Sequence, residues 1–209
     1  PLYTIEDAKN TISLFAPREY GEWFDVIEGV SCMFTDAGHI IGSQCVHLRI
    51  KEDGKERQIT FSGDLGRYRD IILRSPEVFP QADYIIMEST YGNSLHDNIT
   101  GTPEHLLDWI QRVCVDRKGK LILPAFSVGR TQEILYFLNQ LDLENRLPRI
   151  PIFVDSPLSI EATDMVKRFP QYFNKRIQNV MKNDDDPFMF PGLTYIKDVR
   201  DSKALNFRS

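Results

Sequence analysis

Hydrophobic residues in the first ninety or so positions come in short runs of the kind that form strands. Such runs occur at residues 30–39, 45–50, 57–62 and 84–87. Between the second and third runs lies Asp53-Gly54, a pair that favours a hairpin turn. This part of the chain is therefore predicted to be rich in strands.

The start of the chain carries a helix signal in place of a strand signal. Thr4 is followed three residues later by Asp7, a pattern that caps helix N-termini, and we expect a helix over residues 4–16. The first residue is Pro1 and not methionine. We interpret the chain as an excised piece of a longer protein.

The pattern changes after about residue 93 to alternating helices and strands. Thr102-Pro103 offers a cap and a first-turn proline for a helix. The elements expected next are a strand at 120–124, a helix at 131–141, a strand at 151–155 and a helix at 160–169. Repeated units of this kind predict a parallel sheet covered by helices. We place the domain boundary between residues 92 and 93.

Composition and net charge exclude few classes of protein. The 209 residues are 42% hydrophobic, enough for one large or two small globular domains. The net charge of −5 gives no general attraction to nucleic acid, so a polyanion would need a local basic groove or a bound metal. No apolar run approaches the ~20 residues that span a bilayer, so no membrane contact is predicted.

The three cysteines are widely spaced and form no CxxC pair, which favours free thiols over a disulfide framework or a zinc ribbon. They are Cys32, Cys45 and Cys114. We therefore expect a reducing, cytoplasmic location.

Two glycine-flanked residues are candidate metal ligands. His39 lies in Asp36-Ala-Gly-His39-Ile-Ile-Gly-Ser43, and Asp64 lies in Ser62-Gly-Asp64-Leu-Gly66-Arg67. Alone, each could be a turn residue, with Asp64 capping a turn or helix. Together, an imidazole and a carboxylate at adjacent strand ends are ligands that zinc accepts, and a shared carboxylate can bridge two metals.

These two motifs, followed by Glu88-Ser-Thr-Tyr-Gly92, occur in the order and spacing found in RNA nucleases of the metallo-β-lactamase fold. The segments 124–133 and 154–158 resemble the β-CASP domain inserted in that family. The resemblance covers about residues 33–173. It implies an α/β chain, with a partial metallo-β-lactamase αββα sandwich in residues 1–92. A Rossmann-like β-CASP domain with a parallel sheet would follow in 93–209.

The resemblance also implies an activity and roles for three residues. The parent protein would be a zinc-dependent ribonuclease of RNA processing or decay, with two zinc ions. His39 would bind one zinc, and Asp64 would bridge both and act in catalysis. Glu88, the second catalytic residue, would orient a histidine that protonates the leaving oxygen. RNA is favoured over DNA because the DNA-processing branch usually carries other versions of these motifs.

One departure from the family pattern affects activity. The His-x-His-x-Asp-His signature is absent, and the only histidines are His39, His47, His96 and His105. We interpret the last three as structural or solvent-facing. Two metal ligands are too few for a tight site, so we expect this chain to be inactive alone.

Two predicted strand-to-helix junctions could bind the phosphates of the substrate. They contribute Ser127, Gly129 and Arg130, and Ser156 and Ser159. Helix N-termini attract phosphate, and Arg130 could add a guanidinium contact. Simple capping of the helices by serine is the alternative.

Two other functions stay open from the sequence. The parent could be a non-catalytic RNA-binding or scaffold member of the family, or a hydrolase of small molecules on the same fold. The sequence also leaves open whether the protein forms a homo-oligomer.

Overall fold

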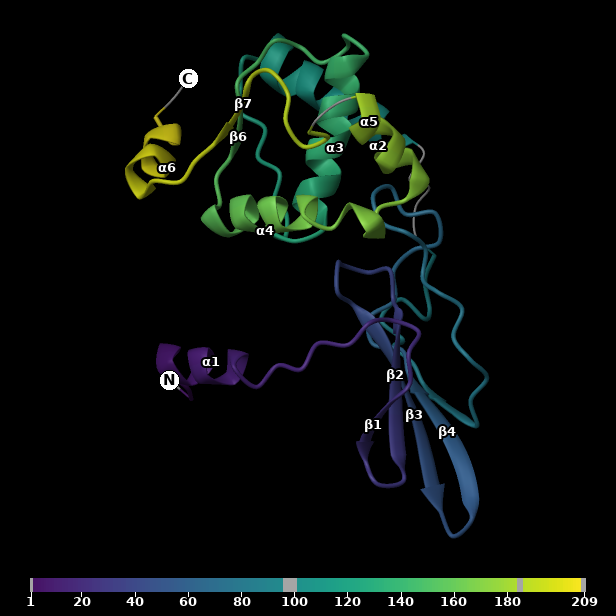
Figure 1. The fold of residues 1–209 in the computed structure, drawn as a ribbon. Helices are drawn as coiled ribbons and strands as arrows, with labels where there is room; N and C mark the ends of the chain where they lie inside the picture. The colour runs from purple at the N-terminus through teal and green to yellow at the C-terminus, as the bar shows by residue number, and fades with distance from the viewer. Residues whose placement is uncertain (1, 96–100, 184–185, 208–209) are drawn as a thin grey trace. The chain divides into compact units, whose positions relative to one another are not determined.

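The computed structural model describes residues 2–95, 101–183 and 186–207. By their contacts the residues form two compact units (Figure 1). The first contains Pro1–Ala37, Ser43–Leu65 and Glu77–Glu88, and the second contains Gly38–Gly42, Gly66–Pro76 and Ser89–Ser209. Each unit is described by itself below.

A five-stranded sheet forms the body of the first unit. Its strands are β1 (Phe24–Ile27), β2 (Val30–Asp36), β3 (Gln44–Glu52), β4 (Lys55–Phe61) and β5 (Tyr84–Ile86), in that spatial order. The first four pair antiparallel, and β5 pairs parallel with β4. The predicted strand-rich region is confirmed.

The hairpin between β3 and β4 turns where the sequence predicts. Asp53 and Gly54 have φ angles of 51° and 73°. Positive φ at both central residues matches the right-handed twist of the flanking strands, and an Asp-Gly pair adopts it readily.

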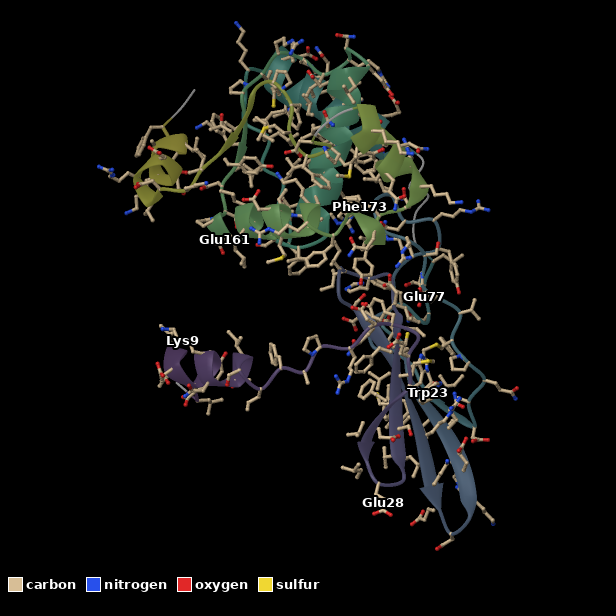
Figure 2. All side chains as sticks on the ribbon, viewed as in Figure 1. Lys9, Trp23, Glu28, Glu77, Glu161 and Phe173 are labelled. Atoms are coloured by element: carbon tan, nitrogen blue, oxygen red, sulfur yellow. The ribbon has the colours of Figure 1, made fainter. Side chains whose placement is uncertain are left out.

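Helix α1 (Ile5–Ile12) begins as predicted and ends early. The Thr4 hydroxyl accepts from the Asp7 amide at 3.2 Å, and the Asp7 carboxylate accepts from the Thr4 amide at 2.8 Å. The expected extension to residue 16 is wrong. No residue of α1 is buried, and its side chains, Lys9 among them, project outward (Figure 2). Without a packed face, a short helix gains little from further turns.

Helices dominate the second unit. It contains α2 (Thr102–Ile110), the π-helical segment η2 (Gln111–Asp116), α3 (Arg130–Leu143), α4 (Pro157–Lys167), the 3₁₀ turn η3 (Pro170–Tyr172), α5 (Lys175–Asn183) and α6 (Val199–Leu205). The strands β6 (Ile152–Val154) and β7 (Leu193–Tyr195) pair in parallel. With parallel pairing in both units, the chain is of the predicted α/β class.

Helix α3 supplies much of the core of this unit. Tyr136 and Leu141 are almost wholly buried and belong to one apolar cluster with Phe173, Ile177 and Phe188. The Phe173 and Phe188 rings meet edge to face at a centroid distance of 6.3 Å. The packing therefore fixes α3 and, with it, the loop at its N-terminus.

Two local predictions for the second unit are wrong. Residues 120–124 form no strand, and within the described residues this run has no strand partner. Ile122 is 83% exposed, so burial does not support a strand there either. Thr102 is not the cap of α2; Gly101 occupies that position, and Thr102 is already helical.

Two of the histidines have the structural or solvent-facing roles expected of them. His47 on β3 is wholly buried, and its two ring nitrogens lie 2.9 Å from the hydroxyls of Thr35 and Thr60. Burial lowers the pKa of His47. His105 is exposed on α2, and His96 lies outside the described residues.

Two further observations concern the cysteines and the helices. Cys32, Cys45 and Cys114 are free thiols. Within the described residues, no helix has the length and apolar character needed to cross a membrane.

Because His47 is buried, we expect the free energy of unfolding to fall at acid pH. A depressed folded pKa means that the unfolded chain binds more protons as the pH falls below about 6.5, so the free energy of unfolding drops there. One proton changes that energy by at most about 1.4 kcal/mol per pH unit. Urea unfolding at pH 7.5 and 5.5 should show a smaller loss for His47→Gln than for the unsubstituted chain. Equal losses of unfolding free energy in the two proteins would contradict the assignment of this acid sensitivity to His47.

Candidate functional site

Asp64 and Glu88 follow two neighbouring strands of the first unit. Because β4 and β5 run parallel, their carboxyl ends lie at the same edge of the sheet, where ligands gather in such sheets. Asp64 lies three residues beyond β4, and Glu88 lies two residues beyond β5. The topology thus brings the two predicted catalytic carboxylates to one edge.

The turn that carries Asp64 consists of residues 62–65 and is tight. Gly63 has a φ of 57°, and a Cβ atom there would lie 3.1 Å from the Gln44 carbonyl oxygen. Glycine therefore suits this position on both backbone and steric grounds. Asp64 itself is exposed.

Glu88 is bound to the Asp64 turn. Its carboxylate accepts a hydrogen bond of 2.6 Å from the Leu65 amide. The family resemblance assigns Glu88 to orienting a histidine, and that role stays a prediction. The observed contact gives Glu88 a second task, because it ties the end of β5 to the turn after β4.

His39 belongs to the second unit, in the loop of residues 38–42. The loop requires glycine beside the histidine: Gly38 has a φ of 64°, and a Cβ there would lie 2.8 Å from the Pro76 nitrogen. A Cβ on Gly66 would overlap the Gly38 carbonyl oxygen. The imidazole is exposed. Close backbone packing, rather than burial of the ring, holds the loop in place.

His39 lines a small cavity within the second unit. The cavity measures about 40 Å³, room for roughly one water molecule, and its other walls include Asp70, Gly129, Gln132 and Glu133. The fold therefore brings His39 together with the first of the two predicted phosphate-binding junctions, at the N-terminus of α3.

The two junctions are joined by a buried hydrogen-bonded chain. The side-chain oxygen of Gln132, a residue only 1% exposed, accepts from the Gly129 amide at 2.7 Å. Its nitrogen donates to the Ser127 carbonyl at 3.1 Å and to the Thr163 hydroxyl at 2.8 Å. Thr163 in turn donates to the Ser159 carbonyl at 2.7 Å. The N-termini of α3 and α4 are thereby fixed to each other.

Capping accounts for several groups at these junctions. The Ser156 hydroxyl accepts from the Ser159 amide at 3.1 Å, and Ser159 is buried. The Gly129 amide is taken by Gln132. Observed hydrogen bonds therefore support the capping alternative. Phosphate binding by Ser127, Gly129, Ser156 and Ser159 stays a prediction.

Arg130 forms an ion pair with Glu133, with 2.6 Å between the nearest nitrogen and oxygen, and Arg67 lies 3.6 Å from the same carboxylate. Burial raises the pKa of Glu133, and the guanidinium groups of Arg130 and then Arg67 oppose that rise. The Arg130 side chain is still 52% exposed. It can stabilise a buried carboxylate and present part of its guanidinium to solvent.

The ligand types of this chain suit zinc, but their number is small. His39 offers an imidazole and Asp64 a carboxylate, the donors that zinc accepts. In the part of the chain that the structure describes, no three histidine, cysteine, aspartate or glutamate side chains gather closely enough to hold a metal ion. These residues alone do not make a complete centre, since zinc takes three or four protein ligands.

Sequence reasoning missed Gln132 and Thr163 as parts of this region. A signal was present for the first, because a glutamine three residues after a helix cap is the capping-box pattern. For Thr163 no local signal exists, since its partner lies 31 positions away.

Comparison with known proteins gives one domain match and several similar proteins. Residues 131–209 match the Beta-Casp domain. Ribonuclease TTHA0252 of Thermus thermophilus is 34% identical over 206 residues, which cover 99% of this chain and 46% of that protein. Transcription termination factor FttA of Methanococcus maripaludis is 29% identical over 97% of this chain and 32% of its own length. Endoribonuclease YSH1 of Kluyveromyces lactis is 29% identical over 95% and 26%.

The matches to these relatives extend over almost the whole chain, and two of the three relatives are named ribonucleases. Residues 131–209 therefore resemble the β-CASP domain, and the chain resembles these relatives over almost its whole length. It spans between about a quarter and a half of the length of these curated relatives.

The buried chain through Gln132 predicts a contrast between two glutamines of α3. Gln132→Leu would leave the Gly129 amide, the Ser127 carbonyl and the Thr163 hydroxyl without this partner, at a cost of about 2–4 kcal/mol. Gln140→Leu is the matched control. The Gln140 side-chain nitrogen is buried with no hydrogen-bond partner among the described residues, so its removal should be neutral or stabilising. Urea midpoints at constant m value would compare them, and equal losses would contradict the assignment.

Proposed function

We propose that the intact protein containing this chain is a zinc-dependent ribonuclease of RNA processing or decay. The observation that carries the proposal is the placement of Asp64 and Glu88 at the shared end of two parallel strands, where Glu88 accepts from the Leu65 amide. The names of its relatives support RNA as the substrate, since two of those described above are called ribonucleases. The same names give less support to a small-molecule hydrolase on the same fold.

The residues of this chain would have distinct roles in the reaction. His39 and Asp64 would each donate to zinc, with Asp64 bridging two ions, and other residues of the intact protein would complete the coordination. When bound, zinc supplies a Lewis acid and a water molecule of lowered pKa. Glu88 would hold the Asp64 turn and orient a histidine toward the leaving oxygen. Arg130, with Ser127, Gly129, Ser156 and Ser159, would contact backbone phosphates.

A non-catalytic RNA-binding or scaffold role is the rival within the family. The presence of His39, Asp64 and Glu88 favours catalysis, because an RNA-binding scaffold has no need of these ligands. The cytoplasmic location predicted from the free thiols belongs to the same proposal.

The role of Asp64 can be tested by Asp64→Asn in the intact protein. A neutral amide cannot balance the charge of two cations, so RNA cleavage should fall by several orders of magnitude and zinc should be lost on dialysis. RNA affinity should change far less. Near-normal turnover together with full zinc content would contradict the bridging role.

The 209-residue chain by itself serves as the control in that experiment. With two zinc ligands it should retain zinc weakly and should not cleave RNA. Two tightly held zinc ions per chain, or clear turnover, would show that the described residues suffice.

Arg130 has two candidate roles that one pair of variants separates. Under the phosphate role, Arg130→Lys weakens RNA binding by about tenfold or more, because lysine cannot reproduce the bidentate contact. The loss should be similar for different RNA sequences, since phosphate contacts carry no base information. Under the structural role, loss of the Glu133 ion pair in Arg130→Ala lowers the melting temperature only.

Both quantities are measured on the same purified variants of the intact protein. Destabilised variants whose folded fraction binds RNA with undiminished affinity would contradict the phosphate role.

A further inference from the structure

Ser62 lies at the start of the Asp64 turn and is only 1% exposed. Its amide donates to the Ile86 carbonyl at 2.9 Å, and its carbonyl accepts from the Cys45 thiol at 3.2 Å. Its hydroxyl accepts from the Glu88 amide at 3.1 Å and donates to the Gly63 carbonyl at 2.7 Å. Every polar group of Ser62 therefore has a partner at the shared end of β4 and β5.

The other end of the turn is bound by the same acidic residue. The Glu88 carboxylate accepts from the Leu65 amide at 2.6 Å, while the Glu88 amide donates to the Ser62 hydroxyl. One residue thus holds the first and last positions of the four-residue turn, with Asp64 between them. The contact to the carboxylate is charge-assisted and so the stronger of the two.

We propose that Ser62 is a positioning residue for Asp64, acting through Glu88. This inference rests on the catalytic role proposed above for Asp64. A free turn samples many backbone conformations, and a misplacement of about 1 Å at a reacting group can cost about 10²-fold in rate. The Ser62 hydroxyl fixes the Glu88 backbone, and the fixed Glu88 carboxylate then holds Leu65 beside Asp64.

The chemistry of the site restricts the residue at this position. Alanine would remove the acceptor for the Glu88 amide and with it this tie between the Glu88 backbone and the turn. Threonine would keep the hydroxyl but add a methyl group at a site that is almost fully enclosed. Serine supplies both an acceptor and a donor in the smallest side chain that has them.

Thr60 provides a matched control for the loss of one buried hydroxyl. It lies two residues earlier on β4, is wholly buried, and its hydroxyl contacts the His47 ring at 2.9 Å. Among the described residues, that hydroxyl makes no hydrogen bond to the Asp64 turn. Thr60→Val should therefore destabilise the sheet and leave the turn unchanged.

The experiment compares Ser62→Ala with Thr60→Val in the intact protein. For Ser62→Ala, hydrogen–deuterium exchange of the amides in residues 63–65 should rise about tenfold, and kcat for RNA cleavage should fall about tenfold or more. The RNA dissociation constant should stay within about twofold because phosphate contacts lie elsewhere. For Thr60→Val, the melting temperature should fall, while exchange in the turn and kcat stay near those of the unsubstituted protein.

Each contrary result has a separate meaning. Unchanged exchange in residues 63–65 of Ser62→Ala would overturn the hydrogen-bonded clamp. Faster exchange with an unchanged kcat would overturn its positioning role. If the unsubstituted intact protein did not cleave RNA, the proposed function would fail instead, and the exchange comparison would still decide whether Ser62 holds the turn.

Discussion

The parallel pairing of β4 with β5 is the constraint on which the site at Asp64 and Glu88 depends. Three residue pairs connect the strands, from Ile59 with Tyr84 to Phe61 with Ile86. Antiparallel neighbours would send the two chain ends to opposite edges of the sheet. Because these two strands run together, a turn and a carboxylate separated by more than twenty residues meet within hydrogen-bonding distance.

The second unit relies on a different principle, the burial of one helix. Side chains along α3 enter a common apolar cluster, and the polar Gln132 is buried at the end of the same helix. The cost of burying that amide is offset because both of its ends are hydrogen-bonded. Packing thus sets where α3 lies, and Gln132 then sets the backbone around Gly129.

Sequence patterns predicted what is decided locally. Thr4 with Asp7 located the start of α1, Asp53-Gly54 located a hairpin, and the alternation of helices and strands located α3. They failed where a distant partner decides, as for residues 120–124, whose apolar run resembles a strand but has no strand partner among the described residues. The candidate site shows the same division. The motifs singled out Asp64 and Glu88, but the bond from Leu65 to Glu88 depends on strand pairing that no local pattern specifies.

The order in which the chain visits the two units has an evolutionary consequence. Residues 38–42 and 66–76 pack with the second unit although the segments on either side belong to the first, so the chain passes between the units five times. A single crossover within a gene exchanges one continuous stretch of sequence. No such stretch contains either unit whole and alone. Recombination would therefore tend to pass the two units on together, and a change in one would have to remain compatible with the other over many generations.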